Sequence, residues 1–247
     1  MWPIADEARM NNSHLLVLAG GFGTRLRSAV ADVPKALATV AGRPFLQYLV
    51  DAWIEQGLTQ LTFLLHHQAD LIEAFLEQQQ SNGRLAHCEI RISREPQPLG
   101  TGGAVAYAVR QLGLTKSFLV TNADTWLGKG IAQVSEAAMP AIGIIRVVNS
   151  ERYGAVRVQD GRLVSFEEKQ DSTGPGWISA GLYHLHADLF RSWDGRPFSL
   201  ERELFPKLVA AGQLHAAPLD TDFIDIGIPD DYHRFSRWID SEKSGVL

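Results

Sequence analysis

Short apolar segments alternate with segments of helical periodicity through the first half of the chain. The predicted strands cover residues 14–20, 61–67, 88–93 and 117–124, and the predicted helices cover 44–57, 69–80 and 101–112. Strands that alternate with crossover helices pair as a mostly parallel sheet, with helices packed on both of its faces. We therefore expect an α/β fold of the Rossmann-like kind, with a mixed, mainly parallel central sheet. Ligands bind such sheets beyond the carboxyl ends of the strands.

The pattern changes in the second half and predicts a small antiparallel insertion. Residues 155–169 form two runs of alternating polarity around Asp160-Gly161, a dipeptide typical of hairpin turns. Residues 178–186 form a further predicted strand. These strands follow one another without helical segments between them, which favours antiparallel pairing.

Two predicted helices close the chain. The first covers 199–212, where Pro206 should kink or split it, and the second covers 229–243. No linker-like, repetitive or low-complexity segment interrupts the sequence, so we expect residues 14–247 to form a single domain. Residues 1–13 lack an apolar core and are predicted to be a polar N-terminal tail.

Composition and charge exclude several classes of protein. The 247 residues are 45% hydrophobic and 21% charged, as in ordinary soluble globular proteins. The net charge of −5 argues against a nucleic-acid partner, because such proteins are normally basic. Cys88 is the single cysteine, so an intramolecular disulfide and a cysteine zinc site are excluded, in keeping with a cytoplasmic location. No apolar run approaches the roughly 20 residues that cross a membrane.

Residues 18–35, LAGGFGTRLRSAVADVPK, place glycines and cations directly after the first predicted strand. The glycines permit positive φ and leave backbone N–H groups uncovered, and such groups in a tight turn form an anion nest. The positive charges add to this preference, so we expect a polyanion such as a triphosphate to bind. The segment contains Gly20, Gly21, Gly23, Arg25, Arg27 and Lys35. It lacks the P-loop string, and Leu26 stands where the dinucleotide fingerprint has its third glycine.

The same segment resembles the signature of the sugar-1-phosphate nucleotidylyltransferases, G-G-x-G-T-R-L followed by a Pro-Lys pair. Further segments resemble this family in its own order: EPQPLGTGGAV at 95–105, TNAD at 121–124, YGAV at 153–156, FEEK at 166–169, SAGLY at 179–183 and DIGIPDDY at 225–232. The resemblance implies the nucleotide-diphospho-sugar transferase type of α/β fold. It also implies transfer of a nucleotidyl group from a nucleoside triphosphate to a sugar 1-phosphate, with release of pyrophosphate.

Within the family, the likeness favours members that use GTP and D-glycero-D-manno-heptose 1-phosphate. Guanylyl transfer to mannose 1-phosphate, and uridylyl or thymidylyl transfer to another sugar 1-phosphate, stay open as alternatives. So do transfer of a sugar from a nucleotide sugar to an acceptor and, in a different class, a catalytically silent sensor of sugar nucleotides. The aromatic residues of RFSRWI, 234–239, are compatible with a homodimer.

The resemblance assigns the nucleotide to two segments and the phosphates to three cations. The nucleotide-binding residues are Leu18, Ala19, Gly20, Gly21, Gly23, Thr24, Glu95, Gly100 and Thr101. Arg25 would hold the β and γ phosphates, Lys35 would stabilise the α-phosphate, and Lys169 would contact the sugar phosphate. The attacking phosphate oxygen is already an anion, so the reaction needs no general base. Catalysis therefore depends on positioning and charge stabilisation.

Two aspartates are candidate ligands of a magnesium ion. Asp124 and Asp225 each end an apolar run, where a carboxylate needs a partner to offset its desolvation. Mg²⁺ favours one or two carboxylates together with phosphate oxygens and water. We expect the two side chains to converge on one Mg²⁺ between the substrates. Asp220 and Asp222 form a rival Asp-x-Asp pair, which we rank lower because it precedes the apolar run.

The sugar site implied by the resemblance contains Asn122, Tyr153, Gly154, Glu168, Ser179 and Gly181. Ser179 departs from the family, which usually has asparagine there, so the identity of the sugar stays open. Glu201 resembles a glutamate of relatives, but an ordinary position on the surface of a helix fits it equally well.

Glu95 favours guanine as the base. A carboxylate only accepts hydrogen bonds, and the Watson–Crick edge of guanine presents two adjacent donors. The amide of a glutamine would suit the other bases better. Gly100, Gly102 and Gly103 would let the base lie close to the backbone.

Overall fold

The computed structural model describes residues 13–23, 26, 30, 33–150, 153, 155–167 and 174–244. Within these ranges, nine strands form one sheet in the order β5-β4-β1-β6-β11-β8-β12-β10-β9. The strands are β1 (His14–Leu18), β4 (Gln60–Leu65), β5 (Glu89–Arg94), β6 (Ser117–Asn122), β8 (Ala141–Val147), β9 (Ala155–Gln159), β10 (Arg162–Glu167), β11 (Gly176–His186) and β12 (His215–Leu219). Apart from Ser13, the predicted polar tail lies outside the described residues.

The two halves of the sheet follow the two patterns of the sequence. Strands β5, β4, β1 and β6 are parallel, and helices α2 (Phe45–Glu55), α3 (Ala69–Ser81) and α4 (Gly100–Leu112) connect them. Strand β11 then runs antiparallel to both β6 and β8, while β12 is parallel to β8. The β9–β10 hairpin turns at Asp160 and Gly161, which have φ of 50° and 75°. The predicted mixed α/β fold with an antiparallel insertion is confirmed.

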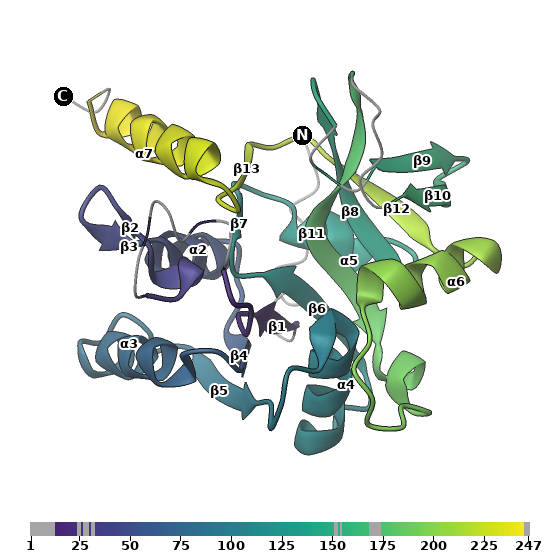
Figure 1. Cartoon of the computed structure of the whole chain (residues 1–247), viewed down its shortest axis with the longest axis horizontal. Coiled ribbons are helices and arrows are strands. Elements are labelled where there is room, and N and C mark those ends of the chain that lie inside the picture. Colours follow the sequence, from purple (N-terminus) through teal and green to yellow (C-terminus); the bar gives the residue numbers. More distant parts are fainter. Residues whose placement is uncertain are drawn as a thin grey trace, which may run out of the picture.

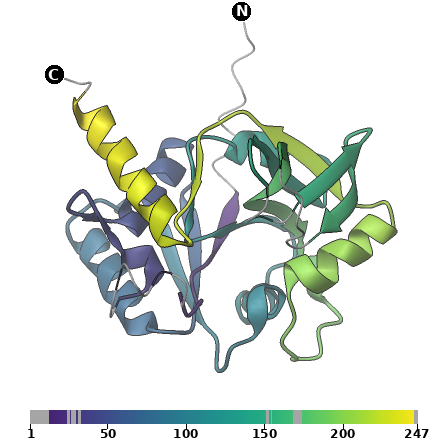
Figure 2. The ribbon, with the colours of Figure 1, turned by 45° about the horizontal axis from the view of Figure 1, so that its top comes forward.

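Helices cover both faces of the sheet. Along β1, Leu15 and Val17 pack into one apolar cluster with α2, α3, α5 (Ile131–Glu136) and α7 (Pro229–Ser244). Leu16 points to the opposite face and packs with α4 and α6 (Phe205–Ala210). This alternation is the period of a strand that is buried on both sides. In Figures 1 and 2, α2, α3 and α7 gather at one end of the molecule and the β9–β10 hairpin lies at the other.

Several elements, most of them short, were not predicted. They are η1 (Lys35–Leu37), β2 (Thr39–Val40), β3 (Arg43–Pro44), β7 (Thr125–Leu127), β8, α5, η2 (Ala187–Phe190), β12 and β13 (Phe223–Asp225). Segments of two or three residues are too short for a periodicity to be read from them. The predicted split at Pro206 is confirmed, because a π-helical turn, η3 (Leu200–Leu204), precedes α6 and Pro206 lies in the first turn of α6. Among the described residues, no helix combines the length and the apolar character needed to cross a bilayer.

Candidate active site

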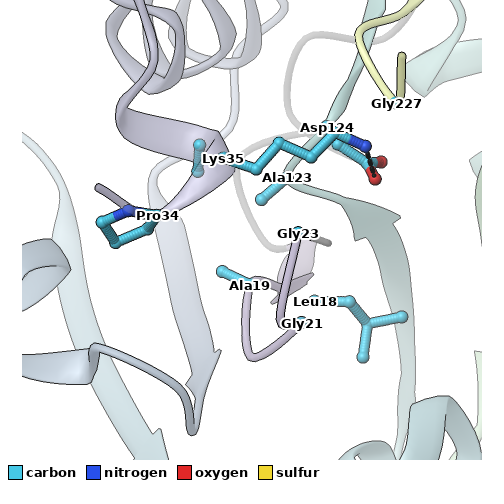
Figure 3. A pocket seen from close by; sticks show the side chains of 10 residues that line it. Leu18, Ala19, Gly21, Gly23, Pro34, Lys35, Ala123, Asp124 and Gly227 are labelled. Atoms are coloured by element: carbon cyan, nitrogen blue, oxygen red, sulfur yellow. Dashed lines mark hydrogen bonds and ion pairs between the residues drawn. The ribbon is translucent and has the colours of Figure 1, made fainter. Parts of the chain in front are cut away.

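A cavity of about 200 Å³ opens beyond the carboxyl ends of β1 and β6. It is lined by Leu18, Ala19, Gly21, Gly23, Pro34, Lys35, Ala36, Ala123, Asp124 and Gly227. Figure 3 shows the glycine turn on one side and the Lys35 side chain extending across the cavity to Asp124. The structure thus brings together six of the sequence-predicted site residues, from residues 18–35 and from the end of β6, and adds Gly227 from a third segment.

The glycine turn leaves β1 with its backbone exposed to the cavity. Gly23 has φ of +59°, a conformation that favours glycine, and an added Cβ there would lie 3.4 Å from Lys35 Cβ. An added Cβ at Gly21 would meet nothing within 4 Å. Gly20 faces another way, since its added Cβ would lie 3.0 Å from Glu95 Oε1 and 3.1 Å from the His66 amide nitrogen. The turn therefore contacts both the cavity and the Glu95 segment.

Some of the predicted phosphate-binding and sugar-binding residues lie outside the part of the chain that the structure describes. Thr24, Arg25 and Arg27 lie outside the described residues, so their predicted contacts with phosphates stay predictions. The same holds for Gly154, Glu168 and Lys169 on the sugar side.

Lys35 joins the two predicted metal ligands. Its Nζ lies 2.7 Å from Asp124 Oδ2 and 3.7 Å from Asp225 Oδ1. The two carboxylate oxygens are therefore no farther apart than the sum of these distances. Only 13% of the Lys35 side chain is exposed, against 36% for Asp124 and 32% for Asp225. Asp124 and Asp225 therefore do not lie on opposite sides of the molecule, an arrangement in which they could not have shared an ion.

A small antiparallel ladder holds the two aspartates side by side. Strand β13 pairs with β7, so Asp225 stands opposite Thr125. The Ile226 N–H donates to the Asp124 carbonyl at 2.9 Å, which ties the turn after β13 to the end of β6. Two residues about a hundred positions apart thus become neighbours through a pairing of three residues on each strand.

The charges around Asp124 favour its ionised form. Burial acts to raise the pKa of this carboxyl, but the Lys35 ammonium and hydrogen bonds from Lys35 and Thr125 outweigh burial and hold the pKa below its usual range. Two carboxylates face a single ammonium, so the cluster carries a net negative charge. Both carboxylates already face one cation, and their oxygen donors fit the preference of Mg²⁺. Among the described residues, no group of three or more histidine, cysteine, aspartate or glutamate side chains could hold a metal ion.

Gly227 is a site residue that was not predicted from the sequence. Its N–H donates to Asp225 Oδ1 at 2.6 Å, and an added Cβ would lie 2.8 Å from that oxygen and 3.2 Å from Lys35 Nζ. A side chain at this position would therefore displace either the carboxylate or the ammonium. The signal was present in the string Asp225-Ile226-Gly227, where a glycine follows a candidate ligand by two residues.

The described residues of the predicted sugar site surround the same end of the sheet. Gly181 has φ of +70°, and an added Cβ would lie 2.8 Å from Asn122 Nδ2. The Ser179 hydroxyl accepts the Gly181 N–H at 3.3 Å. The Tyr153 ring packs edge-to-face on Phe223 of β13, with 5.5 Å between ring centroids. Gly181 therefore permits the close approach of Asn122, the last residue of β6, two positions before Asp124.

Glu95 is buried beside the glycine turn. Only 8% of the residue is exposed, and its Oε2 accepts the Leu99 N–H at 2.9 Å. Burial raises the pKa of this carboxyl, and the Leu99 N–H and the nearby His66 oppose that rise. A carboxylate oxygen has two lone pairs, so Oε2 can still accept a second hydrogen bond.

The glycines that follow Glu95 have another role in the structure. An added Cβ at Gly100 would lie 2.6 Å from the Phe198 carbonyl oxygen, and one at Gly102 would lie 2.1 Å from the Phe198 ring. An added Cβ at Gly103 would lie 2.8 Å from Leu99 Cβ. The glycines thus admit Phe198 against the start of α4, while their predicted contact with a base stays a prediction.

Residues 14–242 match the protein family described as Nucleotidyl transferase. The chain is 30% identical over 228 residues to D-glycero-alpha-D-manno-heptose 1-phosphate guanylyltransferase of Aneurinibacillus thermoaerophilus, covering 90% of this chain and 96% of the relative. It is 31% identical over 226 residues to mannose-1-phosphate guanylyltransferase 1 of Arabidopsis thaliana. In that case the match covers 88% of this chain but spans 62% of the plant protein.

Solved structures also show similarity to this chain. The crystal structure of HddC from Yersinia pseudotuberculosis matches with a TM-score of 0.80 and 30% sequence identity, covering 92% of this chain and 99% of HddC. The structure of HddC complexed with GMP-PN matches with a TM-score of 0.79 and 29% identity over the same shares of the two chains.

Proposed function

The chain belongs to the nucleotidyl transferase family and is an enzyme of nucleotidyl transfer to a sugar 1-phosphate, and we propose that it transfers the guanylyl group of GTP to D-glycero-D-manno-heptose 1-phosphate. The observation that carries the proposal is the cavity in which the glycine turn, Lys35 and Asp124 meet. The heptose-specific relative, matched over 96% of its length, supports this choice of sugar.

In this reaction an oxygen of the sugar phosphate forms a bond to the α-phosphorus as the bond to the β-phosphate oxygen breaks. Two polyanions must approach in line, so charge stabilisation is the main requirement. The N–H groups of Gly21 and Gly23 bind phosphate oxygens at the mouth of the cavity. Lys35, held at its edge by Asp124, supplies a positive charge for the α-phosphate. Arg25 and Lys169 complete the set in this proposal, for the pyrophosphate and the sugar phosphate respectively.

Asp124 and Asp225 are proposed as ligands of Mg²⁺, because both carboxylates already face a common cation at 2.7 and 3.7 Å. When bound, the ion would neutralise charge on phosphate oxygens. Gly227 keeps this cluster compact, since its N–H fixes Asp225 Oδ1. Asp220 and Asp222 precede β13 and are not part of this proposal.

GTP is favoured by the buried Glu95 carboxylate and by the guanylyl relatives. Guanine can donate two hydrogen bonds to a carboxylate, whereas uracil and thymine donate one between two acceptors. Guanylyl transfer to mannose 1-phosphate is the second candidate. It is favoured by the identity to mannose-1-phosphate guanylyltransferases, but the chain spans only 62% of the plant protein.

A matrix of substrates tests the proposal. Four nucleoside triphosphates are combined with heptose, mannose and glucose 1-phosphates, with Mg²⁺ present and pyrophosphate release as the readout. We expect GTP with D-glycero-D-manno-heptose 1-phosphate to give the highest kcat/KM. The Asp124→Asn variant, which keeps the shape of the side chain, should lose turnover while it still binds GTP. Binding of GTP without pyrophosphate release from any pair would instead indicate a silent sensor.

The cellular setting is a further part of the proposal. A cytoplasmic enzyme fits a GTP substrate and a chain with the single cysteine Cys88. A homodimer is a proposal of the same kind, which sedimentation of the purified protein would test. The aromatic residues of 234–239 do not support it, because Phe235 is fully buried and Trp238 packs against the core of the same chain.

A further inference from the structure

The segment around Phe198 is fastened to the start of α4. The Phe198 carbonyl accepts the N–H groups of Gly102 and Gly103, at 3.0 and 3.2 Å, and the Phe198 N–H donates to the Leu99 carbonyl at 2.9 Å. The first N–H groups of a helix have no partner within the helix. Two of them, at Gly102 and Gly103, are satisfied here by a distant segment, so these two are not available to a phosphate. Leu99 is held from both sides, because its own N–H donates to Glu95.

Glu201 lies at the centre of this junction. Its Oε2 accepts hydrogen bonds from the hydroxyls of Thr101, at 2.6 Å, and Ser199, at 2.7 Å. The Thr101 hydroxyl also accepts the Leu200 N–H at 2.9 Å. Glu201 is therefore not an ordinary surface residue of a helix. It is half-buried within a π-helical turn. Such turns are rare in proteins, and those that occur often lie at functional sites.

The second oxygen of Glu201 points to the opposite side of the junction. The hydroxyl of Tyr183 donates to Glu201 Oε1 at 3.5 Å, and Ser179 lies on the same strand, β11. Tyr183 is 2% exposed, and its ring packs on Phe205 with 4.9 Å between centroids. Hydrogen bonds thus run from Thr101, at the start of α4, through Glu201 to Tyr183 on β11, the strand that also carries Ser179.

The two ends of this network are proposed to bind different substrates. Glu95, Gly100 and Thr101 are the residues proposed for the base, and Ser179 is proposed for the sugar. We infer that Glu201 is a positioning residue that couples the two substrate pockets, so that binding of either substrate orders the wall of the other. This inference rests on the proposed function, and Glu201 itself need touch neither substrate.

The coupling is measured as the change in affinity for one substrate when the other is bound. Calorimetry would follow binding of α,β-methylene GTP, which cannot be cleaved, with and without the sugar 1-phosphate that supports pyrophosphate release. In the unaltered enzyme we expect the sugar 1-phosphate to tighten nucleotide binding by about tenfold. In Glu201→Ala the effect should fall below about twofold, while affinity for the nucleotide alone changes little. Glu201→Gln keeps an acceptor for Thr101 and Ser199 and should recover part of the coupling.

Two further variants separate coupling from folding. Tyr183→Phe removes only a hydroxyl and should lose the coupling as Glu201→Ala does, which keeps the inference testable if Glu201→Ala does not fold. Glu203→Ala is the matched control, because Glu203 belongs to the same turn and accepts the Ser199 N–H, at 3.0 Å, rather than the hydroxyl of Thr101 or Tyr183. It should keep the full coupling.

Absence of coupling in the unaltered enzyme, or full coupling in both Glu201→Ala and Tyr183→Phe, would overturn the inference. Failure of the proposed function has a different signature, which is the absence of pyrophosphate release from the unaltered enzyme with every substrate pair.

Discussion

Replacing Lys35 by methionine isolates the charge at the centre of the site. Methionine keeps most of the length of the side chain and removes the ammonium that faces Asp124 at 2.7 Å and Asp225 at 3.7 Å. Two carboxylates then face each other with no cation between them. We expect the variant to be less stable than the unaltered protein at pH 7.5, with no divalent metal and no nucleotide present.

The magnitude follows from the burial of the partners. Removing one partner of a fully buried ion pair costs about 3–5 kcal/mol, whereas exposed pairs contribute about 0–1 kcal/mol. Lys35 is 13% exposed, but Asp124 is 36% exposed and solvent screens it. We therefore expect a loss of about 2 kcal/mol in the free energy of unfolding, or about 5 °C in Tm for a chain of this length.

Urea unfolding of four proteins measures the effect as a double-mutant cycle. The Lys35→Met and Asp124→Asn changes should be non-additive, because the double variant removes both the cation and one of the two carboxylates. The exposed Lys129 provides the control, since Lys129→Met should change stability by less than about 0.5 kcal/mol.

Added Mn²⁺, a stand-in for Mg²⁺, should stabilise Lys35→Met more than the unaltered protein, because the ammonium no longer competes for the two carboxylates. Strict additivity in the cycle, together with equal responses to Mn²⁺, would refute the reasoning. It would mean that Lys35 and the aspartates do not share one electrostatic site.

Three further predictions concern selectivity, packing and pH. Glu95→Gln should lower kcat/KM for GTP by at least about tenfold while that for UTP rises or holds, since the amide matches uracil better; steady-state pyrophosphate release checks this, and an unchanged GTP/UTP ratio would count against a role in reading the base. Gly100→Ala should cost at least about 2 kcal/mol, because φ is +72° and the new Cβ would lie 2.6 Å from a carbonyl oxygen. Gly113→Ala, at φ +63° with nothing within 4 Å, should cost only about 1 kcal/mol, and equal losses in thermal unfolding would contradict the packing argument. Burial is the largest cause that lowers the pKa of His14 below its ordinary value of 6.5, followed by the nearby Arg91. The unfolded chain therefore takes up a proton first as the pH falls below that value, and stability should drop. His14→Gln should lessen this acid sensitivity in unfolding measured at several pH values, and an identical pH profile would argue against it.

Much of the fold followed from local patterns in the chain. The alternation of apolar runs and amphipathic segments predicted β1, β4, β5 and β6 with their connecting helices, and Asp160-Gly161 predicted the hairpin. Such signals are local, because the period of two or 3.6 residues is set by the backbone itself. The glycine turn and Lys35 were also readable, since backbone exposure and charge are properties of the residues alone.

Other features depended on contacts between distant segments. The three-residue strands β7 and β13 carry no periodicity, yet their pairing sets Asp225 beside Asp124. The sequence around Glu201 is compatible with an ordinary surface position, and only the folded chain brings Thr101 and Tyr183 against this side chain. The packing of Phe198 against Gly102 was also not readable from the sequence, because Phe198 lies almost a hundred residues later. The chemical type of a residue limits which partners it can have. The packing of the whole chain decides which of these partners it contacts, and no short window of sequence determines that packing.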